Sequence, residues 1–180
     1  MKRLFTRLDG PILMAPRAIG DERGFFCETY RQTEFSELGV HEEMVQDIHS
    51  RSRYGIVRGM HFQIGEGAAK LIRCARGAIF DVMVDLRAGS PTFGQWEGFE
   101  LTEENMHMAY CPIGFAHGFC VLSDIADVMY KQSNYYADAT ERGIAYNDPD
   151  LAIEWPVPVS AVSANDASAP SWAAFLRHLP

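Results

Sequence analysis

The chain has 180 residues and a mass of 20.2 kDa, which predicts one domain, residues 1–180, with a sizeable hydrophobic core. Hydrophobic residues make up 47% and charged residues 22%, as in ordinary soluble globular proteins. The net charge of −8 argues against nonspecific nucleic-acid binding, which needs a basic surface, so local cations must bind any anionic ligand.

The sequence contains no targeting or membrane signal. No stretch approaches the roughly 20 apolar residues of a membrane span, and the N-terminus lacks the apolar run of a signal peptide. The four cysteines show no C-x-x-C spacing and lie in strand-like apolar runs. We therefore expect a cytoplasmic protein with buried reduced thiols and without nucleic-acid or membrane partners.

The N-terminal quarter predicts two strands and one helix. The strands are expected at residues 12–16 and 24–30, with a charged, glycine-bracketed turn at 20–24 between them. A short helix is expected over 31–39, ended by Gly39. Glu28 lies inside the aromatic second strand, where it is either a solvated side chain or a ligand contact.

From residue 44 onward the pattern is almost entirely β. Strands are predicted at residues 44–51, 56–63, 69–75, 78–86, 96–101, 107–110, 115–122 and 127–133. Such short strands with Gly-, Pro- and Asn-rich turns indicate a sandwich, barrel or jelly roll rather than a parallel α/β sheet. The tail predicts an extended piece at 153–156, a loop at 157–170 and a last helix at 172–178.

One segment, residues 58–63, does not have the pattern of ordinary core. Alternation in a strand would place Arg58, Met60 and Phe62 on one face and His61 on the other. The imidazole lies between two cations, Arg58 and Lys70. A base beside two anion-binding side chains suits a negatively charged substrate that must lose a proton.

Three of the six histidines, His49, His61 and His117, lie in informative contexts, although a structural role is the more common outcome for each. The stretch 112–117 fits the second cupin motif, Pro-x-Gly-x-x-His. The first motif, His-x-His, is absent because Gly59 and Gln63 flank His61. The pattern therefore supports a cupin scaffold without its metal.

Proton transfer is the chemistry that the residues favour. No G-x-S-x-G motif and no cysteine with a histidine neighbour support nucleophilic hydrolysis. His61 can act as a base, Lys70 or a neutral histidine can stabilise an enolate, and Tyr130 can act as an acid. Taken alone, Tyr130 would most often be a half-buried structural aromatic residue.

The sequence resembles the dTDP-4-dehydrorhamnose 3,5-epimerase family from about residue 20 to residue 170. No single block of matching residues is specific for the family, but the number of blocks and their order along the chain make the resemblance specific. The matching blocks include Gly20-Asp21-Glu22-Arg23-Gly24-Phe25-Phe26, Arg58-Gly59-Met60-His61-Phe62-Gln63, Lys70-Leu71-Ile72-Arg73, Asp81-Val82-Met83-Val84-Asp85-Leu86-Arg87, Gly114-Phe115-Ala116-His117-Gly118-Phe119 and Tyr130-Lys131.

The resemblance implies a mainly β, cupin-type jelly roll with a few short peripheral helices, without metal or cofactor and usually a homodimer. It also implies epimerisation of dTDP-4-keto-6-deoxyglucose at C3 and C5 through an enolate. His61 would be the base, Asp166 its dyad partner that fixes the tautomer, Tyr130 the acid on the opposite face, and Lys70 the donor to the C4 oxyanion. The implied nucleotide-sugar contacts are Arg23, Glu28, Gln46, His49, Arg58, His117 and Glu141.

Three departures from the family pattern affect the substrate more than the chemistry. Ile48 replaces an asparagine, Asn165 replaces a lysine, and Tyr146 stands where the family has tryptophan. A different nucleotide, a different keto-sugar and epimerisation at one carbon therefore remain open. A metal-dependent cupin enzyme and a non-catalytic sugar-nucleotide-binding cupin are the alternative functions.

Overall fold

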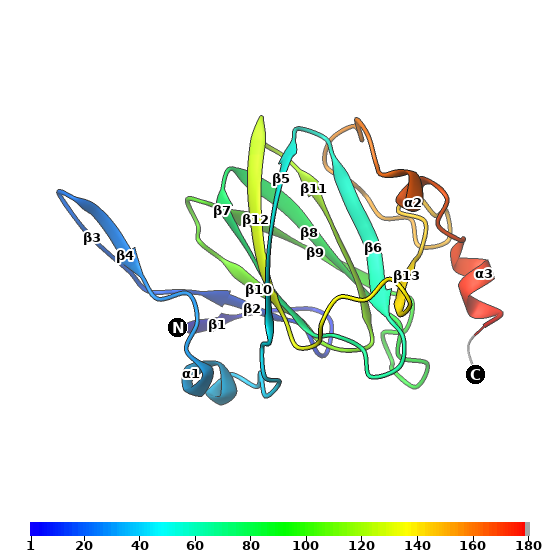
Figure 1. The fold of residues 1–180 in the computed structure, drawn as a ribbon, viewed down its shortest axis with the longest axis horizontal. Helices are drawn as coiled ribbons and strands as arrows, with labels where there is room; N and C mark the ends of the chain where they lie inside the picture. The colour runs from blue at the N-terminus through cyan, green and yellow to red at the C-terminus, as the bar shows by residue number, and fades with distance from the viewer. Residues whose placement is uncertain (179–180) are drawn as a thin grey trace.

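Two antiparallel β-sheets face each other in the computed structural model, which describes residues 1–178 (Figure 1). The six-stranded sheet has the order β1 (Lys2–Leu4), β2 (Ile12–Ala15), β10 (Met108–Cys111), β7 (Lys70–Arg76), β12 (Ile125–Gln132), β5 (Gln46–Arg53). The five-stranded sheet has the order β13 (Glu141–Gly143), β6 (Val57–Gln63), β11 (Phe115–Val121), β8 (Ala78–Asp85), β9 (Trp96–Thr102).

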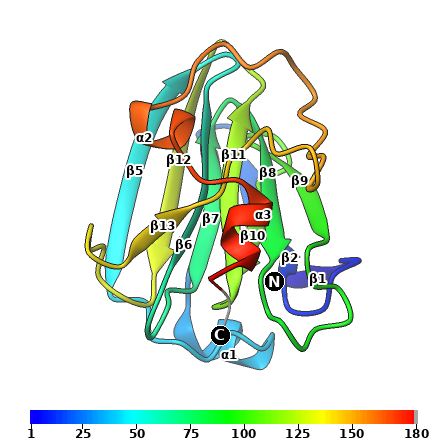
Figure 2. The same ribbon diagram turned by 90° about the vertical axis from the view of Figure 1, so that its right-hand side faces the viewer.

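The remaining elements lie at the periphery. A hairpin of β3 (Ala18–Asp21) and β4 (Gly24–Cys27) extends away from the two sheets, on the side opposite to β6 (Figure 1). The helices are α1 (Gln32–Glu37), α2 (Ala164–Ala167) and α3 (Trp172–Leu176). Figure 2 shows α2 and α3 together on the side of the five-stranded sheet. Within residues 1–178, no helix is long and apolar enough to cross a membrane.

The main core lies between the sheets and follows from strand alternation. Ile72 and Val128 enter it from the six-stranded sheet, and Ile79 and Phe119 from the five-stranded sheet. Burying each such side chain contributes roughly 1.5–3 kcal/mol. The faces that meet here are called the inward faces below. The mainly β, jelly-roll prediction is confirmed.

The structure differs from the sequence prediction where elements are short. The strands β1, β3 and β13 and the helix α2 were not predicted. The side chains of β3 are all exposed, so this strand carries no alternating apolar signal. The predicted helix is confirmed as α1, and Gly39 follows it with a φ of 103°.

Strict alternation over residues 58–63 was also predicted, and it is wrong. His117 pairs with His61, but Phe119 pairs with Arg58, so β6 uses one extra residue between these pairs. His117 and Phe119 are two residues apart and share the inward face, so Arg58 and His61 share it too. The bulge needs glycine at Gly59, where φ is 129° and a Cβ would lie 2.5 Å from the Cα of the facing β11 glycine.

All four cysteines are free, and Cys74, Cys111 and Cys120 are buried, which confirms most of the prediction for the thiols. Cys27, on the projecting hairpin, is only half-buried. Burial raises the pKa of the Cys74 thiol to about 11 and that of Cys111 to about 12. These thiols are therefore packing groups and not nucleophiles.

Candidate active site

The centre of the candidate site is a hydrogen bond between His61 on β6 and Asp166 on α2. His61 Nε2 lies 2.6 Å from Asp166 Oδ1, and the carboxylate is 5% exposed. Burial opposes ionisation of Asp166, but hydrogen bonds from His61 and Ser163 outweigh it and lower the pKa of the carboxyl. An ionised carboxylate only accepts hydrogen bonds, so Nε2 carries the proton and Nδ1 is the free basic atom.

Helix α2 places this carboxylate against β6. Ser163 caps the helix, because its Oγ accepts from the Asp166 N–H at 3.0 Å. The segment before the helix is tied to the start of β6 by a hydrogen bond from Val57 N–H to the Ala161 carbonyl at 3.2 Å. The predicted loop at 157–170 therefore contains the helix that carries the partner of His61.

Two more predicted site residues share this inward face. Glu141 Oε1 on β13 lies 3.6 Å from His61 Nδ1, beyond hydrogen-bonding distance. Arg58 Nε donates to Ser52 Oγ of β5 at 2.9 Å. The bulge in β6 is what brings Arg58 and His61 to the same face.

His117 is buried next to this group and has its own carboxylate partner. Its Nε2 lies 2.7 Å from Asp81 Oδ2, and Asp81 is fully buried on β8. The other carboxylate oxygen, Asp81 Oδ1, has no hydrogen-bond partner among residues 1–178. The pair holds the imidazole ring of His117 and leaves one buried acceptor available.

The facing sheet supplies Lys70, Tyr130 and Gln46. Tyr130 on β12 pairs in register with Ile72 of the core, so it points inward. Lys70 and Gln46 pair in register with the next inward residue of β12, Gln132. Lys70 is 6% exposed, and its ammonium group has no hydrogen-bond or ion-pair partner within the described part of the chain.

Burial raises the pKa of Tyr130, the nearby Glu141 raises it further, and Arg58 lowers it. Because the net shift is upward from 10.0, the phenol is protonated at neutral pH. The site therefore has a candidate base on the five-stranded sheet and a candidate proton donor on the six-stranded sheet. A group held between the two sheets could lose a proton on one side and receive one on the other.

Three predicted contact residues lie elsewhere. Arg23 is in the turn of the projecting hairpin, where its Nε donates to Asp21 at 3.1 Å. Glu28 follows the hairpin and accepts from Arg31 Nε at 2.8 Å. His49 on β5 points to the outer face, with Nε2 3.2 Å from Asp127 Oδ1. Within one chain, none of the three lies on the inward faces.

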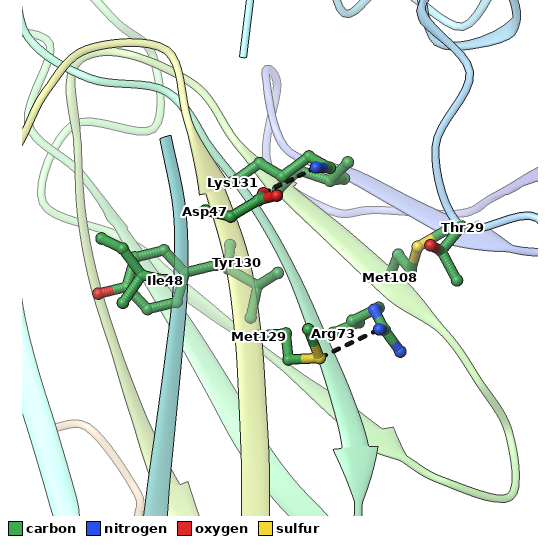
Figure 3. A pocket seen from close by; sticks show the side chains of 10 residues that line it. Thr29, Asp47, Ile48, Arg73, Met108, Met129, Tyr130 and Lys131 are labelled. Carbon is green, nitrogen blue, oxygen red and sulfur yellow. Dashed lines mark hydrogen bonds and ion pairs between the residues drawn. The ribbon is translucent and has the colours of Figure 1, made fainter. Parts of the chain in front are cut away.

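A pocket of about 210 Å³ lies on the outer face of the six-stranded sheet, away from His61. Lys131, Arg73 and Met108 extend into it, whereas Tyr130 and Ile48 extend to the opposite side of the strands (Figure 3). This pocket is therefore not the place where the candidate acid and base meet. Within residues 1–178, no three His, Cys, Asp or Glu side chains cluster as metal ligands do.

Sequence reasoning assigned no role to three polar residues on the inward faces, Asp81, Gln63 and Gln132. Asp81 accepts from His117, and Gln63 Nε2 is buried without a hydrogen-bond partner among residues 1–178. The signal for Asp81 was present, because a charged residue inside an apolar strand needs a partner. Nothing in the sequence distinguishes Gln132 from a solvated side chain.

Comparisons with known proteins agree with this geometry. The family model described as dTDP-4-dehydrorhamnose 3,5-epimerase matches residues 5–174. The dTDP-4-dehydrorhamnose 3,5-epimerase of Salmonella typhimurium is 49% identical over 168 residues, 92% of each chain. That of Pseudomonas aeruginosa is 52% identical over 155 residues, covering 84% of this chain and 86% of the relative.

Solved structures give the same result. The crystal structure of a dTDP-6-deoxy-D-glucose-3,5-epimerase from Legionella pneumophila in complex with dTDP-4-keto-L-rhamnose has a TM-score of 0.91 and 44% identity to this chain. The match covers 94% of this chain and 92% of the Legionella chain.

Proposed function

Because this chain belongs to the dTDP-4-dehydrorhamnose 3,5-epimerase family, we propose that it is an isomerase that converts dTDP-4-dehydro-6-deoxyglucose to dTDP-4-dehydrorhamnose. The observation that carries the proposal is the His61–Asp166 pair on one sheet, facing Tyr130 and a buried, unpaired Lys70 on the other. Each of these side chains has a role in the reaction.

His61 Nδ1 removes the proton from the carbon next to the C4 ketone. The electron pair of the broken C–H bond moves toward the ketone oxygen and forms an enolate. Lys70 donates to that oxygen, where negative charge develops, and such a donor is worth about 10²–10³-fold in rate. Asp166 keeps the proton on Nε2, so that Nδ1 is unprotonated before the reaction.

Tyr130 then gives its phenolic proton to the same carbon from the opposite side. Because His61 and Tyr130 belong to facing sheets, the proton leaves on one face of the sugar and returns on the other, and the configuration inverts. The tyrosinate recovers a proton from water and the imidazolium releases one, so each inversion introduces one solvent hydrogen. Repetition at the second carbon flanking the ketone gives the 3,5-epimer.

The test is solvent deuterium incorporation into dTDP-4-dehydro-6-deoxyglucose, followed at C3 and C5 separately by NMR. We expect deuterium at both carbons without added metal. Deuterium at one carbon would restrict the proposal to a C3- or C5-epimerase. If exchange occurs only on another nucleotide or keto-sugar, that compound replaces the proposed substrate. Such a result would agree with the departures from the family pattern at Ile48 and Asn165. Tight binding without any exchange would overturn the enzymatic function.

A homodimer completes this proposal, because the β3–β4 hairpin, which has Arg23 in its turn and is followed by Glu28, extends away from the two sheets (Figure 1). The hairpin that carries Arg23 exposes Ile19, Phe25 and Phe26 at 58%, 66% and 71%. Exposed apolar groups of this size favour burial against a partner. We infer that the hairpin packs on a second copy and brings Arg23 to the partner's nucleotide sugar.

Mixing two inactive variants tests this arrangement. If Arg23 acts across the interface, a mixed dimer of Arg23→Ala and His61→Ala has one site with both defects and one intact site. Re-associated mixtures should then recover about a quarter of the wild-type activity, since half of the dimers are mixed. No recovery in re-associated dimers would show that Arg23 and His61 act within one chain.

A cytoplasmic location, where thiols stay reduced, remains our expectation.

A further inference from the structure

Three residues form a polar row across the inward face of the six-stranded sheet. Gln132 on β12 pairs in register with Gln46 on β5 and with Lys70 on β7. Side chains at such positions share one face and lie about 5 Å apart at Cβ. Gln132 is 2% exposed, so its amide must find its partners inside the protein.

The hydrogen bonds of the two amides fix which way each one points. Gln132 Nε2 donates to Gln46 Oε1 at 3.1 Å and to the Asn134 carbonyl at 3.2 Å. The backbone N–H of Tyr136 donates to the same Gln46 oxygen at 2.9 Å. A backbone carbonyl can only accept and a backbone N–H can only donate, so neither amide can be reversed without placing like groups together.

The consequence concerns Gln46. Both acceptor positions of its Oε1 are occupied by protein donors, while its NH₂ group has no acceptor among residues 1–178. Gln46 therefore presents two N–H donors and no acceptor to a ligand. It can recognise a phosphoryl, carbonyl or hydroxyl oxygen, and it rejects a group that only donates.

We propose that Gln132 is a positioning residue for substrate recognition: it orients the Gln46 amide so that this part of the site binds an oxygen acceptor of the nucleotide sugar. The inference rests on the proposed function and on the family resemblance, which implies that Gln46 contacts the nucleotide sugar. Gln132 itself uses both of its N–H groups within the protein and acts through Gln46. Its loss should weaken binding and leave the proton-transfer residues in place.

The test is a double-mutant cycle between positions 132 and 46, read in the steady-state kinetics of epimerisation. Gln132→Met keeps the size of the side chain and removes its donors. We expect KM to rise about tenfold with kcat within about twofold of wild type. In the Gln46→Ala background the same substitution should change KM less than twofold, because the amide that it orients is gone. Gln32→Met, on the exposed face of α1, is the matched control.

An unchanged KM in Gln132→Met, or an equal rise in both backgrounds, would overturn the role of Gln132. Normal wild-type turnover in that experiment separates this failure from a failure of the proposed function, which would abolish turnover in the wild type. Circular dichroism and thermal unfolding establish that each variant folds. If Gln132→Met does not fold, Gln132→Glu, which has the same shape and cannot donate when ionised, takes its place in the same cycle.

Discussion

Two buried polar clusters of this protein differ in how completely their hydrogen bonds are made. Asp85, at the end of β8, is fully buried, and its Oδ1 accepts from the backbone N–H and Nε of Arg87. Its Oδ2 accepts from Arg87 Nη2, Ser90 Oγ and Thr92 Oγ1 at 2.7, 2.5 and 2.7 Å. Nothing in this cluster is left for a ligand.

The inward cluster around His61 is the opposite case. Asp81 Oδ1, Gln63 Nε2 and Ser50 Oγ are buried and have no hydrogen-bond partner within residues 1–178. Lys70 Nζ and Tyr130 Oη lie beside them and make no hydrogen bond to the same residues. Leaving buried polar groups unpaired costs stability, so their presence in one region indicates a place where substrate supplies the missing partners. A saturated cluster stabilises the fold, and an unsaturated one is available for chemistry. The predictions below test this distinction.

The largest expected effect is the loss of the base. His61→Ala should reduce kcat by about 10²–10⁴-fold, the usual worth of a general base, while the protein still folds. The His61 side chain is one-third exposed, so its removal opens no closed cavity. Epimerisation assays and thermal unfolding check the two halves of this prediction. Retained turnover would place the base elsewhere.

Loss of the carboxylate beside His61 should have the next largest effect. Asp166→Asn keeps the size of the side chain but no longer requires the proton to stay on Nε2, so we expect kcat to fall roughly 10²-fold. Ser163→Ala is the companion variant, because it weakens the helix cap and leaves the carboxylate in place. A larger kinetic effect from Ser163→Ala than from Asp166→Asn would contradict the dyad.

For the Asp85 cluster, in which all hydrogen bonds are made, we expect a loss of stability and not of kcat. Asp85→Asn should lower the free energy of unfolding by about 3 kcal/mol, because Arg87 loses its buried anionic partner. The kcat of the folded variant should stay within about twofold of wild type. Urea unfolding and steady-state kinetics measure both quantities. A severe loss of kcat in folded protein would remove the contrast between the clusters.

The contribution of the Asp85 cluster to the free energy of unfolding should depend on pH. Burial opposes ionisation of Asp85, but its bonds from Arg87, Ser90 and Thr92 lower its pKa from 3.8 to about 2. A depressed carboxyl pKa stabilises the folded state above the unfolded pKa, by about 2 kcal/mol, and this contribution disappears as pH falls from about 4 to 2. The stability difference between wild type and Asp85→Asn should therefore shrink across that window. A constant difference would contradict the assignment.

The smallest effect is expected next to the acid. Ile48 pairs in register with Tyr130, so its apolar side chain lies beside the phenol on the inward face. Ile48→Asn should leave kcat within about fivefold of wild type and change KM for the nucleotide sugar by a few-fold, because it adds an amide where the family pattern has one. A panel of nucleotide sugars measures the shift. An unaltered substrate preference would show that Ile48 does not influence specificity.

The hydrophobic pattern predicted the strands well where they are long and buried, as in β8 and β11. It could not predict β13, whose three residues carry no apolar alternation, although this strand brings Glu141 beside His61. It also placed Arg58 and His61 on opposite faces. One extra residue in a bulge reverses the alternation, and the need for that residue arises from pairing with β11, not from β6 itself.

The sequence by itself determined the β architecture, the family resemblance and the candidates His61, Asp166, Lys70 and Tyr130, because apolar alternation and ordered motifs are local properties of a chain. Only the tertiary structure decided which candidates meet. It put His61 and Tyr130 on facing sheets, turned His49 to the outer face and carried Arg23 away on a hairpin. The orientation of the Gln46 amide depends on donors from residues far along the chain, and only folding brings such partners together.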